Sequence, residues 1–160
     1  MSDFVSTVDS IGDEALINSI IDRSITEIQD NYTKTIGKYA FQGCEALTTV
    51  NFPAATSIGN NAFQNCSALT TADFPAATSI GSSTFRGCSK LTTVILRSGT
   101  MATLGNTQAF SGTPIESGTG YIYVPAALVD AYKAATNWST YANQFRAIED
   151  YPEICGGETA

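Results

Sequence analysis

A 22-residue repeat runs through the middle of this sequence and restricts what the chain can fold into. Residues 47–66 read LTTVNFPAATSIGNNAFQNC, and residues 69–88 read LTTADFPAATSIGSSTFRGC. The residues that recur at this spacing are Ile36, Ile58 and Ile80; Phe41, Phe63 and Phe85; Cys44, Cys66 and Cys88; and Leu47, Leu69 and Leu91. One unit cannot bury its own apolar side, so the units must stack with equivalent side chains on top of one another.

The repeat predicts a solenoid of short parallel strands joined by irregular arms. Each unit has a strand L-x-x-V-x-F, a Pro turn, an Ile-Gly corner and an arm that carries Phe. One period before the first full unit lie Ile25 and Ile28, and a less regular last unit leads to the strand YIYVP at 121–125. We therefore expect about five coils over residues 25–125, with strands about 4.8 Å apart and a length of roughly 20 Å.

The ends of such a stack need covers, because the terminal coils would otherwise expose apolar faces. Asp13 can cap a helix over DEALINSIIDR, which predicts that residues 1–24 form a helical cap or an attachment segment. The stretch AALVDAYKAATNW has helical spacing, which predicts a helical cap over residues 126–150. Residues 151–160 are expected to be a loose acidic tail that exposes Cys155.

Negative charge gathers at the two ends of the chain. The net charge is −7, and residues 1–30 carry −6 and residues 149–160 carry −4, which leaves +3 for the body. The bases of the body are scattered, which argues against a nucleic-acid partner. The N-terminus lacks the basic start and the apolar run of a secretory signal, and no stretch reaches membrane-spanning length. We therefore expect no membrane insertion, and cysteines that stay reduced.

The frame Ile-Gly-x-x-Ala-Phe-x-x-Cys, which runs from Ile58 to Cys66, resembles the repeat of the BspA-like leucine-rich repeat family. The resemblance covers about residues 25–125, although FPAATSIG is a residue shorter than the usual unit, so that arm should be thin. The resemblance implies a leucine-rich-repeat-like solenoid. It also implies a role in recognition or scaffolding, since similar chains occur as surface adhesins of gut and oral bacteria and among phage and prophage structural genes.

The sequence gives little support for a catalytic site. The chain has no His, which removes Ser-His-Asp and Cys-His catalysis and any mixed zinc site. Cys44, Cys66 and Cys88 would point the same way on successive coils, so we predict a buried column of thiols, with a metal site or disulfides between coils as the alternatives. We expect no catalytic residue, no metal and no cofactor.

The strand positions beside the inward Val face outward, because side chains alternate across a strand. The candidate binding residues on this outward face are Thr49, Asn51, Thr71, Asp73, Thr93, Ile95, Tyr121 and Tyr123. Thr suits strands whatever its role, whereas an aromatic patch outside a sheet is typical of contact sites. The alternative for the patch of Ile95, Tyr121 and Tyr123 is that the closing helix folds back over it.

A rigid strand face predicts a non-enzymatic recognition or scaffold module. Because no export signal is visible, the leading hypothesis is a phage virion surface or appendage protein, assembled in the host cytoplasm. Its strand face would attach to a host glycan or protein, and its N-terminal segment would contact other virion proteins. The alternative is a bacterial cell-surface adhesin whose export signal is absent from this chain. Either could be a homo-oligomer, and an enzyme using Glu45 or Asp73 is a third hypothesis.

Overall fold

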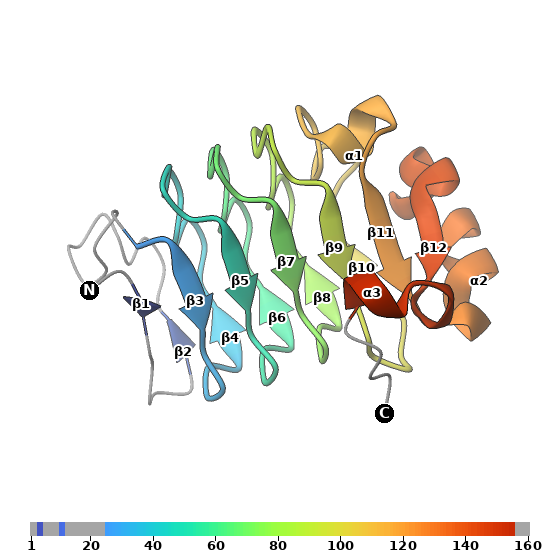
Figure 1. Cartoon of the computed structure of the whole chain (residues 1–160), viewed down its shortest axis with the longest axis horizontal. Coiled ribbons are helices and arrows are strands. Elements are labelled where there is room, and N and C mark those ends of the chain that lie inside the picture. The colour runs from blue at the N-terminus through green and yellow to red at the C-terminus, as the bar shows by residue number, and fades with distance from the viewer. Residues whose placement is uncertain (1–2, 5–9, 12–24, 156–160) are drawn as a thin grey trace.

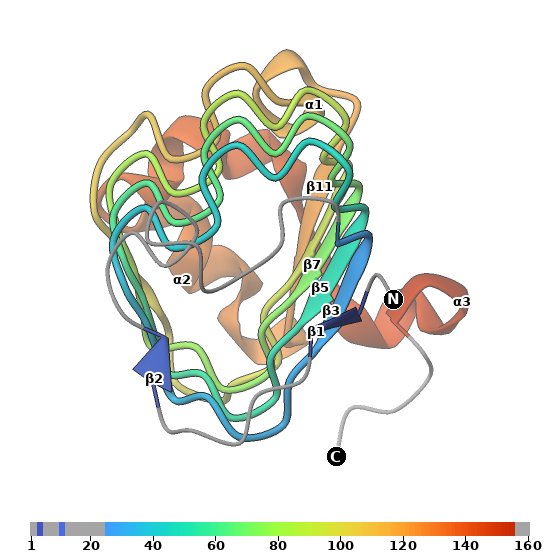
Figure 2. The ribbon, with the colours of Figure 1, turned by 90° about the vertical axis from the view of Figure 1, so that its left-hand side faces the viewer.

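The computed structural model describes residues 3–4, 10–11 and 25–155. In this part of the chain, stacked coils form a solenoid, and each full coil adds one strand to each of two parallel sheets (Figure 1). Seen along the stack, the two sheets lie on different sides of the coil and irregular arms connect them (Figure 2). The predicted fold class, a repeat solenoid of short parallel strands, is confirmed.

The longer sheet has seven strands among the described residues, in the order β1-β3-β5-β7-β9-β11-β12. These strands are β1 (Asp3–Phe4), β3 (Glu27–Gln29), β5 (Thr49–Asn51), β7 (Thr71–Asp73), β9 (Thr93–Ile95), β11 (Tyr121–Val124) and β12 (Phe145–Ala147). Val50 pairs with Ile28 on one side and with Ala72 on the other, as the 22-residue period requires. The structure therefore contains the five predicted strands and adds one at each end.

The shorter sheet is built from the Ile-Gly corners. Its strands, in the order β10-β8-β6-β4-β2, are β2 (Ser10–Ile11), β4 (Thr35–Ile36), β6 (Ser57–Ile58), β8 (Ser79–Ile80) and β10 (Thr103–Leu104). Ile36, Ile58 and Ile80 are each about 1% exposed and point into the solenoid. Each coil thus contributes apolar side chains to the core from two sides.

The solenoid begins earlier than residue 25, the predicted boundary. Phe4 in β1 pairs with Ile28, and Ile11 in β2 pairs with Ile36. These offsets are 24 and 25 residues instead of 22, so this coil does not appear in the repeat pattern. The helix predicted over DEALINSIIDR lies outside the described residues.

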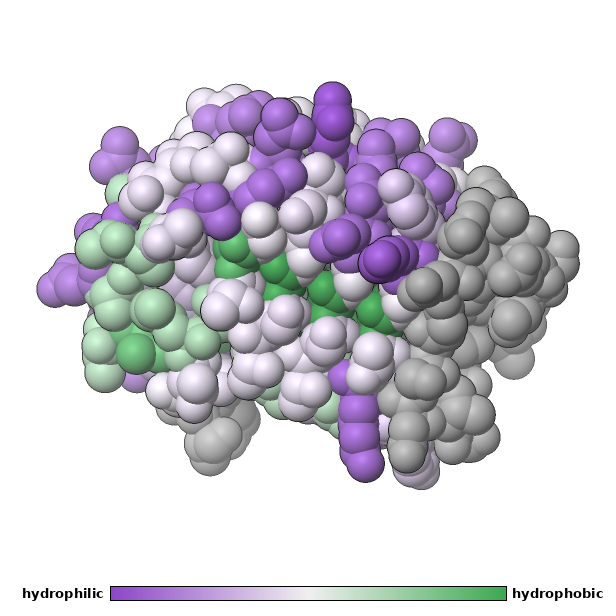
Figure 3. Space-filling model, turned by 180° about the vertical axis from the view of Figure 1, so that it is seen from behind, coloured by the Kyte–Doolittle hydropathy of each residue, from purple (hydrophilic) through white to green (hydrophobic). Residues whose placement is uncertain are grey.

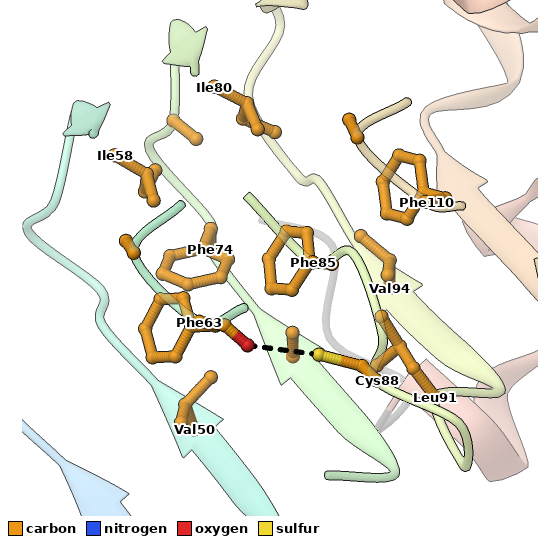
Figure 4. Close-up of a cluster of buried hydrophobic side chains, with 14 of the residues drawn as sticks. Val50, Ile58, Phe63, Phe74, Ile80, Phe85, Cys88, Leu91, Val94 and Phe110 are labelled. Atoms are coloured by element: carbon orange, nitrogen blue, oxygen red, sulfur yellow. Dashed lines mark hydrogen bonds between the residues drawn. The ribbon is translucent and has the colours of Figure 1, made fainter. Parts of the chain in front are cut away.

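Two stacks of phenylalanine rings form the centre of the core. Rings from successive arms stack in parallel, with centroid distances of 5.2 Å for Phe41–Phe63, 5.6 Å for Phe63–Phe85 and 5.5 Å for Phe85–Phe110. Phe52 and Phe74, at the ends of β5 and β7, form a second stack with a centroid distance of 5.7 Å. Phe74 lies beside the first stack, with its ring centroid 5.9 Å from that of Phe63 and 6.2 Å from that of Phe85 (Figure 4). The predicted stacking of equivalent residues is confirmed.

The three aligned cysteines form the predicted buried column of free thiols. The thiol of Cys88 donates to the carbonyl of Phe63 in the preceding coil at 3.1 Å (Figure 4). In the same way, the thiol of Cys66 donates to the carbonyl of Phe41 at 3.2 Å. The hydrogen bond with Cys44 lowers the pKa of the Cys66 thiol. The hydrogen bond with Cys88 and burial together raise this pKa by more, so it lies well above its usual range. Cys66 and Cys88 therefore each link a coil to the preceding one through a thiol hydrogen bond.

The glycine of each Ile-Gly corner allows neighbouring coils to approach closely. A Cβ atom added at Gly59 would lie 2.7 Å from the carbonyl carbon of Gly37 and from the amide nitrogen of Lys38. Both atoms belong to the backbone of the preceding coil, so they cannot move away without disturbing the ladder. Only glycine fits at this corner.

We predict that Gly59→Ala destabilises the protein by about 2 to 3 kcal/mol, because the added methyl group overpacks a backbone contact. Gly99→Ala is the matched control, since a Cβ atom there meets nothing within 4 Å. Urea unfolding followed by circular dichroism measures both. Equal stability of the two variants would contradict the close-packed corner.

The C-terminal end of the solenoid is closed by a mixed cap rather than by the purely helical cap predicted for residues 126–150. Its elements are η1 (Ala126–Leu128), α2 (Val129–Ala134), η2 (Trp138–Gln144), β12 and η3 (Ile148–Asp150), and a short helix, α1 (Pro114–Ser117), precedes β11. The sequence pattern did not predict β12, because FRA is only three residues long and is separated in sequence from its partner β11 by helices. None of the described helices is long and apolar enough to cross a membrane.

Side chains of the cap complete the hydrogen bonding of the last coil. The hydroxyl of Tyr132 accepts from the amide of Ala102 at 2.8 Å, and the indole of Trp138 donates to the carbonyl of Ala102 at 2.8 Å. The hydroxyl of Tyr141 accepts from the amide of Phe110 at 3.2 Å and donates to the carbonyl of Thr107. These backbone groups would pair with a further coil in a longer solenoid, so the cap ends the stack without leaving them unpaired.

Tyr141→Phe should destabilise the protein by about 1 to 2 kcal/mol, because it leaves the buried amide of Phe110 without an acceptor. Tyr32→Phe is the control, since Tyr32 is 55% exposed. Thermal unfolding of both variants gives the comparison. A Tyr141→Phe variant as stable as the control would show that the cap does not supply this bond.

Candidate binding face

The register of the longer sheet aligns the predicted binding residues into two rows. Thr49, Thr71, Thr93 and Tyr121 pair in one row, and Asn51, Asp73, Ile95 and Tyr123 pair in the other. We call these eight residues the outer face. Their side chains point away from the core because the strand residues between them, such as Val50 and Ala72, are buried inside the solenoid.

The prediction of an exposed aromatic patch at the end of the outer face is wrong. Ile95 and Tyr123 are only 2% and 3% exposed. They pack with Ile148 and Cys155 in a small cluster, against which Tyr121 and Tyr151 also lie. Tyr123→Ser would therefore remove a buried side chain, contrary to the expectation for a free contact residue. The alternative is right that the patch is covered, but the cover is formed by Ile148, Tyr151 and Cys155 near the C-terminus and not by the closing helix.

Residues 151–155 of the predicted loose tail are ordered and form part of this cover. Residues Pro152–Cys155 form the helix α3, which lies outside the longer sheet (Figures 1 and 2). Cys155, expected to be an exposed thiol, is 1% exposed. Burial raises the pKa of the Cys155 thiol, and the positive charge of Arg97 lowers it by less. Pro152 begins the helix, and Cys155 at its end belongs to the buried cluster.

Arg97 is a residue of this face that the repeat pattern did not reveal. Its guanidinium forms an ion pair with Asp73 at 3.3 Å and also donates to the backbone carbonyl of Cys155 in α3. Two residues beyond Ile95, Arg97 follows the same alternation along the chain. This alternation could have indicated that Arg97 faces outward. It could not have indicated the contact of Arg97 with α3, which depends on where the tail docks.

Burial raises the pKa of the Asp73 carboxyl, and the hydrogen bond and positive charge of Arg97 lower it by less. Tyr123 also has a raised pKa, chiefly because burial disfavours its phenolate. Nearby, the guanidinium of Arg146 lies 4.4 Å from the ring centroid of Tyr121. At the covered end of the outer face, the rings of Tyr121 and Tyr123 thus lie close to Arg97 and Arg146.

The uncovered end of the face is polar and half-buried. Thr49, Thr71 and Thr93 expose part of their side chains, and so do Asn51 and Asp73. Within the described residues, the buried side-chain oxygen of Asn51 has no hydrogen-bond partner. An unpaired buried acceptor is uncommon in a folded protein, so Asn51 stands out among the polar residues of this face.

The other side of the molecule offers a different surface. Figure 3 shows it as largely polar or neutral, with a narrow apolar row across it and an apolar area near the C-terminal end. At that end, a pocket of about 330 Å³ is lined by Met101, Ala102, Thr103, Leu104, Ala135, Thr136 and Trp138. Among the described residues, no three His, Cys, Asp or Glu side chains gather as metal ligands would.

A family model described as the BspA type leucine rich repeat region matches residues 9–125 in six copies. The chain belongs to the BspA-type leucine-rich repeat family. The match begins before residue 25 and includes β2, in agreement with a solenoid that starts earlier than the predicted boundary. Among curated proteins, no sequence matches this BspA-type chain.

Two solved structures resemble this BspA-type solenoid. A leucine-rich repeat protein from Bacteroides ovatus ATCC 8483 has 20% identity and a TM-score of 0.53, over 92% of this chain and 42% of its own. A leucine rich cell surface protein from Faecalibacterium prausnitzii A2-165 has 20% identity and a TM-score of 0.45, over 78% of this chain and 48% of its own. At this identity the first similarity shows the fold alone. The BspA-type chain spans less than half the length of each.

The raised pKa of Asp73 makes a prediction about pH. A carboxyl whose folded pKa lies above its unfolded value of 3.8 favours folding when protonated, and this contribution is lost as the pH rises through the folded pKa. Wild type should therefore lose stability relative to Asp73→Asn as the pH rises from 3.8. Urea unfolding at several pH values measures the difference. Thr71→Val, a non-titrating change beside it, should differ from wild type by a constant amount, and a constant difference for Asp73→Asn would refute the assignment.

Proposed function

We propose that this BspA-type solenoid is a non-catalytic binding module whose outer face holds a protein or a glycan on a cell surface. Membership of the leucine-rich repeat family supports a binding role, since a stack of coils supplies a rigid surface rather than a reaction centre. The absence of His from the chain agrees with this proposal.

The register of the outer face is the observation that carries the proposal. Thr49, Thr71 and Thr93 occupy paired positions on adjacent strands, so their hydroxyls repeat at the strand spacing of about 4.8 Å. An extended ligand with hydroxyl or amide groups along its length can bond to several strands at once. A glycan chain and an extended peptide both have this property.

The second row adds groups that distinguish ligands. Asn51 carries the unpaired buried oxygen, and Asp73 beside it carries a carboxylate paired with Arg97. These groups favour a ligand that donates hydrogen bonds, as sugar hydroxyls and peptide amides do. The threonine row can bind many ligands, whereas the positions of Asn51 and Asp73 restrict the orientation of a ligand on the face.

A bacterial cell surface is the setting we propose, in line with the adhesins that the repeat resembles. A phage virion surface is the second setting that the sequence predicts, with the N-terminal segment as the contact to other virion proteins. Neighbouring genes separate the two. Capsid and tail genes beside this one would favour the virion, and an export signal upstream of the repeat would favour the cell-surface adhesin.

Thr71→Arg tests the outer face directly, because it places a long charged side chain in the middle of the threonine row. We expect binding to a glycan microarray, or to immobilised bacterial surface proteins, to fall about tenfold or more, a change of about 1.4 kcal/mol. Ser79→Arg is the matched control, since Ser79 faces outward from β8 on the other sheet. Circular dichroism checks that both variants fold. Binding by Thr71→Arg as strong as binding by wild type, or binding by neither wild type nor variants, would contradict the proposal.

A further inference from the structure

Residues 148–155, which comprise η3, Tyr151 and α3, run across the end of the outer face. Two of their side chains are buried there, Ile148 at 2% and Cys155 at 1% exposure. The ring of Tyr151 packs edge-on against that of Tyr123, with a centroid distance of 5.3 Å. The segment therefore covers the patch that the sequence places on the outside of the sheet. We call residues 148–155 the strap.

The strap packs against a cluster that is separate from the main core. The main core lies inside the solenoid and includes the phenylalanine stacks and the apolar residues of the cap. The strap cluster consists of Ile95, Tyr123, Ile148 and Cys155 on the other side of the sheet. Because the two clusters share no residue, removal of the strap would leave the interior packing unchanged. A small satellite cluster of this kind opens at a lower free energy than the whole fold.

Arg97 connects the strap to the sheet. It pairs with Asp73 in β7 and donates to the carbonyl of Cys155 at the end of α3. A second polar contact, from the amide of Ala126 to the carboxylate of Glu149 at 3.0 Å, is exposed. Exposed and partly exposed charged contacts of this type contribute little, so the strap is held mainly by a few apolar contacts.

We propose that the strap occupies a peptide-docking site in cis, and that a partner polypeptide with similar side chains can displace it. The site consists of Ile95, Tyr121 and Tyr123, with Arg97 as the donor to a main-chain carbonyl. The segment now seated there defines the partner: a short stretch with an aromatic residue, a small apolar residue four positions later, and a free carbonyl beside it. This inference rests on the proposed function, because it adds the covered end to the same outer face.

Displacement of the strap would change the character of the binding face. The closed form presents the polar rows from Thr49 to Thr93, and the open form adds Ile95 and Tyr123 beside them. A partner could then contact polar and apolar positions on adjacent strands together. The strap would thus compete with the partner and keep the apolar end covered when no partner is bound.

The thiol of Cys155 reports on the strap. In the intact chain without denaturant, we expect a maleimide reagent to label Cys155 at least about a hundredfold faster than Cys66 and Cys88, which lie in the main core and require global opening. Mass spectrometry of peptide fragments distinguishes the sites. Arg97→Gln should raise the rate at Cys155 by about twofold to fivefold, whereas Arg86→Gln, an exposed arginine on another arm, should not. Labelling of Cys155 no faster than the core thiols would overturn an independently opening strap.

A synthetic peptide of residues 148–155, with Ser in place of Cys155, tests the docking site in trans. At millimolar concentration it should raise the labelling rate of Cys155 in the intact chain several-fold, because it competes for the place of the strap. The same peptide with Tyr151→Ser should have no such effect. If neither peptide changes the rate, the docking site is refuted. These outcomes involve no external ligand, so they stand apart from the Thr71→Arg binding test.

Discussion

Successive coils of this protein are held at the spacing of a parallel β-ladder, and this spacing decides which residues each position accepts. At Gly59 the neighbouring backbone lies where a Cβ atom would be, so the corner admits glycine alone. At Phe63 a ring from the coil on each side stacks within 5.6 Å. At Cys66 the thiol reaches a carbonyl of the preceding coil. The recurring letters of the sequence thus mark positions where the packing of two coils restricts the side chain.

A solenoid of repeated coils also needs a structure that closes its last coil. The last coil presents backbone groups that the next coil would have paired, and burial makes such groups costly to leave unpaired. Tyr132, Trp138 and Tyr141 supply their partners from the cap, and β12 continues the longer sheet by one short strand. The cap therefore contributes apolar cover and backbone pairing together. Its large aromatic residues suit this role because each carries an apolar ring and one polar group.

The spacing between coils restricts the side chains of the outer face least, and these side chains are the most varied. Its threonines remain half-exposed, while Ile95 and Tyr123 of the same rows are covered by the strap. Asp73 shows how the two parts are joined, since its carboxylate sits in the polar row and pairs with the arginine that holds α3. Burial at this junction raises the pKa of Asp73 despite that pairing. The binding face and its cover are thus one connected surface, which is why we assign the strap a part in binding.

The sequence alone determined the solenoid, its period, the inward and outward rows and the buried thiol column, because repetition requires equivalent residues to stack whatever the details of the arms. It did not determine the first coil, whose offsets of 24 and 25 residues hide it from a 22-residue pattern. Nor did it show that Cys155 is buried or that Arg97 holds α3. Those contacts join residues 58 positions apart that belong to no repeat. Only the tertiary structure decided them, since a non-repeating tail has no equivalent coil to fix its place and docks where apolar surface remains uncovered.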